Sequence, residues 1–110
     1  MIVRVLTATV RTERAAAANA QFRKQVPILR DQPGLVYVKL ARQVGPTHEE
    51  IVLFEEWRDT AALYAWAGPE ITKPRLMPGT EDLLDDLVIS HYEALDVDPE
   101  ADDGTVMESR

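Results

Sequence analysis

Apolar and polar residues alternate over the first ten residues of the chain, MIVRVLTATV, and this period of two is typical of a β-strand. Successive side chains of a strand point to opposite faces of its sheet. We therefore expect one face to carry Val3, Val5, Thr7 and Thr9, and the other to carry Ile2, Arg4, Leu6, Ala8 and Val10.

The apolar spacing changes to three and four residues between positions 13 and 30, which predicts an amphipathic helix. Thr12 is a suitable N-cap residue, and Glu13 is favourable in the first turn, where the helix dipole is positive. The sequence DQPG at positions 31–34 ends the helix. The residues expected on its buried side are Ala15, Ala18, Phe22, Val26 and Leu29.

Three further runs of β-branched and aromatic residues predict strands at positions 35–42, 50–58 and 87–95. The first two of these strands flank the sequence VGPTHEE at 44–50, which has the composition of a hairpin loop. Each of the first three strands of the chain is apolar on both faces, whereas helices cover only one face of such a sheet.

A short helix is predicted between the third and fourth strands. Asp59 or Thr60 would cap its beginning, and Gly68 would end it. Prolines and a glycine allow only a broken helical piece at 70–79, and one turn of helix is expected at 81–86.

The predicted order is strand, helix, strand, strand, helix, strand, which is the split βαβ arrangement of a ferredoxin-like α+β fold. The second apolar face of the sheet needs a cover that the chain's own helices do not supply. The simplest cover is the same sheet of a second copy related by a twofold axis, so we expect a homodimer.

The acidic residues are distributed unevenly along the chain. Of the 110 residues, 12 are basic and 19 acidic, giving a net charge of −7. Residues 96–110 contain six of the acids and one base, so we expect a single domain over 1–95 followed by an acidic tail. Nucleic acids and anionic membranes both attract basic surfaces, and neither is an expected partner.

The chain has no cysteine, which excludes disulfides and thiolate chemistry and fits a cytoplasmic protein. His48 and His91 are the two histidines, and neither has the spacing to carboxylates that a metal site requires. We therefore expect no metal site. The chain also lacks a glycine-rich phosphate loop, so no nucleotide or flavin motif is expected.

The chain resembles the antibiotic-biosynthesis monooxygenase family of the dimeric α/β-barrel superfamily over roughly residues 1–95. The resemblance rests on LFEEW at 53–57, RDTAALYAWAG at 58–68 and QFRKQVPILRDQPGLVYVKL at 21–40. It implies a dimeric α/β barrel. It also implies a small oxidoreductase that oxygenates a phenolic, anthrone or quinol-type aromatic with O2 and no cofactor, by desolvating and orienting the reactive anion.

The family's motifs match this sequence only in part. Trp57 matches the tryptophan that lines the pocket in the anthrone oxygenases, but Leu53 stands where those enzymes have an asparagine. Trp66 matches the second-helix tryptophan of the haem-degrading relatives. Their first-strand asparagine is replaced near Leu6 or Thr7, and no histidine occurs at 71–76, where the axial ligand is expected. Haem is therefore disfavoured as a cofactor.

Each candidate site residue has a functional and a structural interpretation. Glu55 or His91 would accept a proton, although a salt bridge from Glu55 to Arg58, Lys39 or Arg42 is the plainer alternative. Tyr64 or Arg75 would orient a substrate oxygen, or lie exposed to solvent. The residues expected to shape the pocket, or simply to pack the core, are Trp57, Trp66, Leu53, Leu6 and Phe22.

Two alternatives remain beside the oxygenase. One is a haem-binding or haem-degrading relative without the usual axial histidine. The other is a dimer that binds a small ligand without turning it over, which the leucines at positions 6 and 53 favour.

Overall fold

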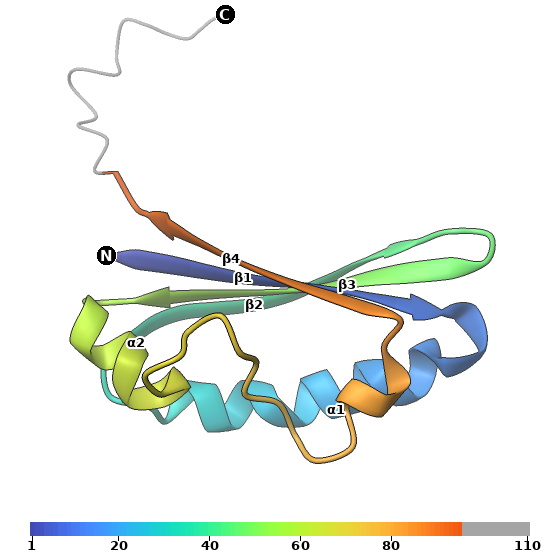
Figure 1. Cartoon of the computed structure of the whole chain (residues 1–110), viewed down its shortest axis with the longest axis horizontal. Coiled ribbons are helices and arrows are strands. Elements are labelled where there is room, and N and C mark those ends of the chain that lie inside the picture. Colours follow the sequence, from blue (N-terminus) through green and yellow to red (C-terminus); the bar gives the residue numbers. More distant parts are fainter. Residues whose placement is uncertain (96–110) are drawn as a thin grey trace, which may run out of the picture.

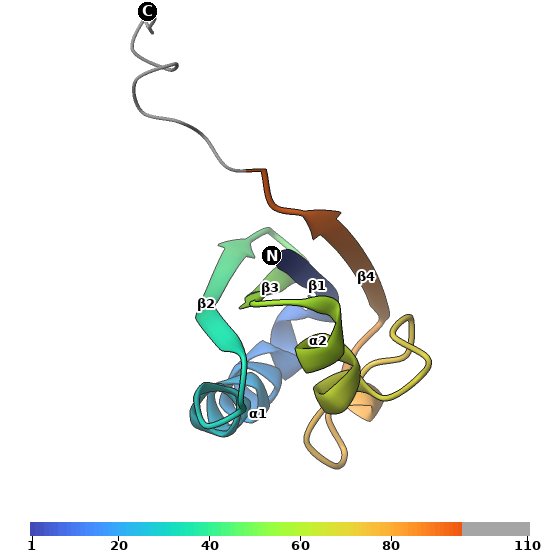
Figure 2. The ribbon, with the colours of Figure 1, turned by 90° about the vertical axis from the view of Figure 1, so that its left-hand side faces the viewer.

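The computed structural model describes residues 1–95, which form a four-stranded antiparallel sheet with helices on one face (Figures 1 and 2). The elements are β1 (Ile2–Arg11), α1 (Thr12–Arg30), β2 (Leu35–Val44), β3 (His48–Trp57), α2 (Thr60–Ala67), the 3-10 turn η1 (Glu81–Leu83) and β4 (Asp86–Glu93). Their sequence and the strand order β2-β3-β1-β4 confirm the predicted ferredoxin-like α+β fold. The tail expected at 96–110 lies outside the described residues.

The core lies between the sheet and the helices, as the alternation in β1 predicted. Leu6 and Ala8 of β1 pair with Leu53 and Ile51 of β3, and all four side chains are buried. Trp57 closes this layer at the end of β3 with an exposed fraction of 0%. The inward face of the strands therefore positions the buried strand residues of the candidate site, among them Trp57.

The helix α1 packs its alanine-rich side and Phe22 against this core. The N-cap predicted at Thr12 is wrong, because β1 runs directly into the helix and its last residue, Arg11, holds the cap position in an extended conformation. Gln25 is buried where Val26 was expected, and Val26 is half-buried. The Gln25 side chain is satisfied there because its Nε2 donates to the Arg75 carbonyl oxygen at 2.7 Å.

The strands and the segment before β4 differ in detail from the prediction. β2 and β3 each extend toward the hairpin, so that only positions 45–47 remain between them instead of 44–50. β4 begins and ends earlier than predicted, at Asp86 and Glu93. Residues 69–80 contain turns and no helix, and the predicted turn of helix is confirmed as η1.

The short helix α2 is fixed at both ends. Asp59 is its N-cap, and its carboxylate accepts a hydrogen bond from the Ala62 N–H at 2.8 Å. Gly68 ends it with a φ of 84°. Gly34 has a φ of 86°, and a Cβ there would collide with the Cβ of Ala62, so α2 rests directly on the turn that precedes β2.

No described helix covers the opposite face of the sheet (Figure 2). This face carries large exposed apolar side chains. Phe54 of β3 is 36% exposed, and Tyr37 of β2, Val88 and Tyr92 of β4 are about half exposed or more, at 49%, 51% and 57%. We call this surface the outer face. Over residues 1–95, no helix has the length and apolar character needed to cross a membrane.

Candidate active site

Strand pairing brings three polar side chains into one row on the helix-facing side of the sheet. Arg4 of β1 pairs with Glu55 of β3 on one side and with His91 of β4 on the other. Arg4 and Glu55 are each only 1% exposed, whereas His91 is half-buried. Alternation predicts that Arg4 and Glu55 both point inward, but only the register makes them neighbours.

The Glu55 carboxylate is held by one oxygen and leaves the other without a partner. Its Oε1 accepts a hydrogen bond of 3.0 Å from the Trp57 indole nitrogen and lies 3.8 Å from Arg4 Nε. Its Oε2 is buried and contacts no donor among the described residues. A buried polar atom without a partner carries a desolvation cost that natural proteins rarely accept without a functional reason.

Arg4 ties this carboxylate to the segment between α2 and β4. Its Nη1 donates to the Ile71 carbonyl at 2.8 Å, and its Nη2 donates to the Lys73 carbonyl at 3.1 Å. The same Nη1 lies 3.2 Å from His91 Nε2. The Arg4 guanidinium therefore links the backbone of the 69–80 segment to the row of polar side chains on the sheet.

Burial shifts the pKa of all three groups. Desolvation raises the pKa of Glu55 to about 7 from an ordinary value of 4.5, although the Trp57 hydrogen bond and the Arg4 charge oppose the shift. Burial also lowers the pKa of Arg4, against the attraction of Glu55. The pKa of His91 is lowered by burial and by the Arg4 charge, so its imidazole is neutral near pH 7.

The two tryptophans stack beside Glu55. Their ring centroids are 6.3 Å apart with an interplanar angle of 24°, and Trp66 is 5% exposed. The Arg75 guanidinium lies 4.1 Å from the centre of the Trp66 ring and donates to the Trp66 carbonyl. Arg75 is otherwise solvent-exposed, and it places a cation against the Trp66 ring.

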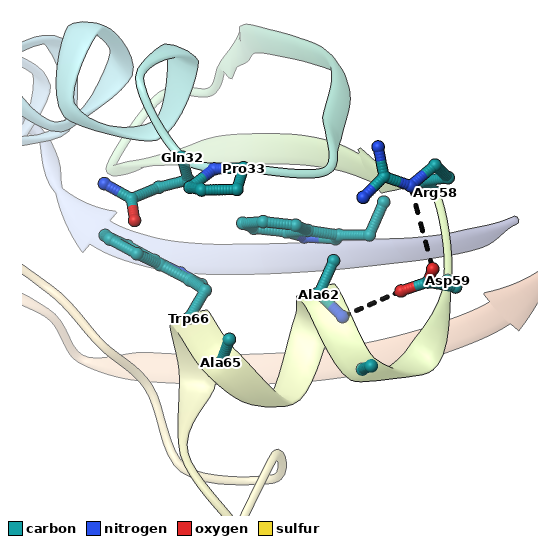
Figure 3. A pocket seen from close by; sticks show the side chains of 9 residues that line it. Gln32, Pro33, Arg58, Asp59, Ala62, Ala65 and Trp66 are labelled. Atoms are coloured by element: carbon teal, nitrogen blue, oxygen red, sulfur yellow. Dashed lines mark hydrogen bonds and ion pairs between the residues drawn. The ribbon is translucent and has the colours of Figure 1, made fainter.

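A pocket of about 270 Å³ opens where α2 meets the turn before β2 (Figure 3). Trp57, Trp66, Gln32 and Pro33 line it, together with Arg58, Asp59 and three alanines of α2. Glu55 is not among its lining residues. Its side chain is 1% exposed, so the carboxylate is closed off from solvent in this conformation.

The remaining predicted site residues lie in two different surroundings. Leu6, Leu53 and Phe22 are fully buried in the core. Tyr64 is 42% exposed on the surface of α2. The salt bridge predicted from Glu55 to Arg58, Lys39 or Arg42 is wrong, because Arg4 is its cationic neighbour. The sequence signal that could have identified Arg4 was a lone charge on an otherwise apolar strand face.

The two histidines lie apart from each other, in different surroundings. His48 lies at the exposed start of β3, where its Nε2 is 3.3 Å from Asp85, and His91 presents Nε2 to a guanidinium. Among residues 1–95, no group of three or more histidine or carboxylate side chains is placed to bind a metal ion. Neither histidine falls at 71–76, where the family resemblance placed the axial haem ligand.

Comparisons with known proteins give the same fold. A family model described as antibiotic biosynthesis monooxygenase matches residues 1–71. A proposed antibiotic biosynthesis monooxygenase from Deinococcus radiodurans is 19% identical with a TM-score of 0.70, over 98% of this chain and 100% of that one. PA3566 from Pseudomonas aeruginosa is 24% identical with a TM-score of 0.68, over 86% and 94% of the two chains.

A haem-degrading protein also shares this fold. MhuD from Mycobacterium tuberculosis, whose structure holds two haems in its active site, is 22% identical with a TM-score of 0.61, over 89% of this chain and 100% of that one. No curated protein matches the chain. At these identities the structural matches establish the fold and not the reaction.

Proposed function

The chain belongs to the antibiotic biosynthesis monooxygenase family, and we propose that it oxygenates a phenolic, anthrone or quinol-type aromatic with O2 and without a bound cofactor. The observation that carries this proposal is Glu55, a buried carboxylate with a raised pKa and one oxygen without a partner. A carboxylate that titrates near neutral pH is well matched to taking a proton from a weak carbon or oxygen acid.

The chemistry balances without a further reductant. For an anthrone, Glu55 removes a proton from the ring methylene, and the resulting anion gives electrons to O2 and forms a carbon–oxygen bond. Glu55 returns its proton to the peroxide. Loss of the second methylene proton and cleavage of the O–O bond then leave a ketone and one water molecule. A low-dielectric site favours such a step because charge is not solvated by water.

The aromatic pair supplies the place for a planar substrate. Trp57 and Trp66 offer ring faces, and Arg75 places a cation where a phenolate or enolate oxygen would lie. A substrate would reach Glu55 by displacing the Trp66 ring or the Ile71–Lys73 segment whose carbonyls Arg4 binds. Tyr64 is 42% exposed and has no direct part in this proposal.

Glu55 is a better candidate base than His91. The His91 Nε2 faces Arg4 Nη1 at 3.2 Å, so a donor already occupies the lone pair that would accept a proton. The free Oε2 of Glu55 has no such competitor among residues 1–95. His91 then serves to hold the Arg4 side chain in position.

We propose that the protein works as a homodimer assembled through the outer face. Val5 of β1 lies beside Phe54 of β3 on this face, Val3 and Val52 lie on the same face, and Tyr37 and Tyr92 extend it to both edges. The same face of a second copy is the simplest cover for these exposed apolar side chains. Sedimentation of wild type against Phe54→Glu tests it, and a monomeric wild type would contradict it.

The test of the reaction is oxygen uptake by the purified protein on a panel of anthrones and hydroquinones, without added metal or flavin. We expect uptake above the spontaneous rate, rising with pH through about 7 as Glu55 ionises. Glu55→Gln should lower kcat by about 100-fold or more, the contribution of a general base. Glu50→Gln, which alters an exposed carboxylate on the outer face of the same strand, is the matched control and should leave kcat unchanged.

Three outcomes would contradict the proposal. Equal rates for wild type and Glu55→Gln would remove the carboxylate from the reaction. Tight binding of panel members without any turnover would instead favour the non-catalytic ligand-binding dimer. A Soret band on adding haem that Trp66→Ala abolishes would favour haem binding, through ligands other than the expected axial histidine.

A further inference from the structure

A cationic groove runs between the second half of α1 and the β2 edge of the sheet. It has a volume of about 570 Å³, and its charged side chains are all basic. Figure 2 shows α1 lying against β2 at this edge. The groove is lined by Arg23, Val26, Pro27, Arg30, Tyr37, Val38, Lys39 and Leu40.

The three cations of the groove are unpaired within the described part of the chain. Arg23, Arg30 and Lys39 form none of the ion pairs found among residues 1–95, whereas exposed Arg11, Arg58 and Lys73 each lie near an acid. Like charges gathered without a counter-charge repel each other, so the groove is suited to an anionic occupant. Its apolar floor of Val26, Pro27 and Leu40 suits an extended chain more than a free ion.

The edge strand adds a second feature to this groove. β2 pairs only with β3 in the order β2-β3-β1-β4, so every second residue of β2 presents backbone N–H and C=O groups to its free side. An exposed strand edge binds extended peptides through main-chain hydrogen bonds. The groove therefore combines a template for an extended segment with positive charge.

The chain itself contains a segment of opposite charge. Residues 96–110 hold six acids (Asp96, Asp98, Glu100, Asp102, Asp103, Glu108) and one base (Arg110), a net charge of −5. Residues 1–95 hold 13 acids and 11 bases, a net charge of −2. Most of the negative charge of the chain is thus concentrated directly after the described domain.

The segment begins at the end of the molecule where the groove lies. Leu35, Trp57, Ile2 and Glu93 form one row across the sheet, so β4 ends level with the beginning of β2. The Ala94 N–H donates to the Met1 carbonyl at 2.9 Å, which fixes the chain two residues before residue 96. Three strand spacings amount to about 14 Å, and 15 residues can span up to about 50 Å.

We propose that residues 96–110 bind in the α1–β2 groove of their own chain, with their acids facing Arg23, Arg30 and Lys39. The docked segment covers the free edge of β2 and neutralises the three cations of the groove. This inference is independent of the reaction at Glu55.

Zero-length coupling with a water-soluble carbodiimide tests this docking on the full chain. The reagent joins a lysine amine to a carboxylate in contact with it, and the chain has three lysines, Lys24, Lys39 and Lys73. We expect acids of 96–110 to couple to Lys39 several-fold more than to Lys24, which lies outside the groove on the same helix. Mixing ¹⁵N-labelled with unlabelled chains should show that these links form within one chain.

A double variant and a change of salt concentration make the result decisive. The double variant Arg23→Gln with Arg30→Gln should reduce the Lys39 coupling several-fold, and both residues are exposed, so the fold is retained. Raising NaCl from about 0.1 M to about 1 M shortens the Debye length from about 10 Å to about 3 Å and should do the same. The proposal would be overturned by equal coupling at Lys24 and Lys39, or by coupling that neither the double variant nor salt reduces. It would also be overturned if the links joined different chains, so that labelled and unlabelled chains were coupled at random.

Discussion

Charged side chains gather at both ends of the β1–β3 pair, in opposite surroundings. At one end Arg4 and Glu55 are each 1% exposed and share a closed, dry row with His91. At the other end Arg11 and His48 each lie within 4.0 Å of Asp85, and the three side chains are between 35% and 59% exposed. The same two strands thus carry a buried ion pair at one end and, at the other, contribute Arg11 and His48 to a solvated cluster around Asp85.

The difference shows why only one end is suited to chemistry. Water and salt screen the exposed cluster, so its charges contribute little to folding. The buried pair is not screened, and its desolvation cost is offset only in part by the Trp57 and backbone contacts. That residual cost holds the Glu55 carboxyl ready to change its protonation near neutral pH.

The largest expected effect comes from removing the buried cation. Arg4→Met leaves Glu55 without its neighbour and strips a donor from the Ile71 and Lys73 carbonyls. We expect the free energy of unfolding to fall by about 3 kcal/mol at pH 7, the lower end of values for breaking a buried pair. Urea unfolding followed by circular dichroism measures it. An effect as small as that of Arg11→Met would remove the contrast between the two ends.

The pH dependence of stability should separate the two ends next. Because the pKa of Glu55 is raised from 4.5 to about 7, the folded chain keeps a proton that the unfolded chain releases between these pH values. Wild type should therefore lose stability as pH rises from 4.5 to 7, relative to Glu55→Gln, and level off above 7. Parallel unfolding free energies for the two proteins across this range would contradict the raised pKa.

A smaller change should follow from removing the indole donor. Trp57→Phe keeps an aromatic ring but takes away the 3.0 Å hydrogen bond to Glu55 Oε1. We expect a loss of about 2 kcal/mol of stability, from the hydrogen bond and the smaller ring. The apparent pKa of Glu55, followed by infrared absorption of its carboxyl group, should rise further. An unchanged pKa would mean that the Trp57 contact does not stabilise the carboxylate.

The smallest effect belongs to the exposed end. Asp85→Asn removes the acid that His48 and Arg11 share, with side chains that water already solvates. The unfolding free energy should change by less than about 0.5 kcal/mol, as for most surface substitutions. The slope of stability between pH 4.5 and 7 should stay as in wild type. A larger loss would show that this cluster is coupled to the core.

The sequence predicted what depends on local periodicity and missed what depends on strand register. Alternation in β1 and β3 correctly placed Arg4 on the same strand face as Leu6, and Glu55 on the same face as Leu53 and Trp57, and all of these side chains are buried. The partner of Glu55 was wrong because Lys39 points to the outer face, Arg58 lies past the strand end, and Arg42 contacts Glu49 at 3.4 Å. Strand pairing decides which cation lies beside which acid. Arg4 and Glu55 are neighbours in the sheet although they are 51 positions apart in the chain.

Buried polar residues were missed for a related reason. Gln25 lies on the core side of α1 because the backbone of residue 75 supplies an acceptor, and no helical pattern contains that information. The N-cap at Thr12 was wrong because the strand leaves no loop in which a separate cap could form. Asp59, by contrast, could be predicted as a cap, since its role requires only the three residues that follow it.

The stacked Trp57 and Trp66 are the chain's only two tryptophans, and both lie at the candidate site. All of the protein's indole fluorescence, and any exciton coupling between rings 6.3 Å apart, therefore originates beside Glu55. The Trp57 ring donates a hydrogen bond to the Glu55 carboxyl group, whose pKa is raised. The unlabelled protein carries its own optical reporter, with no background from elsewhere, for titration of the carboxyl and for an aromatic ligand inserted between the rings.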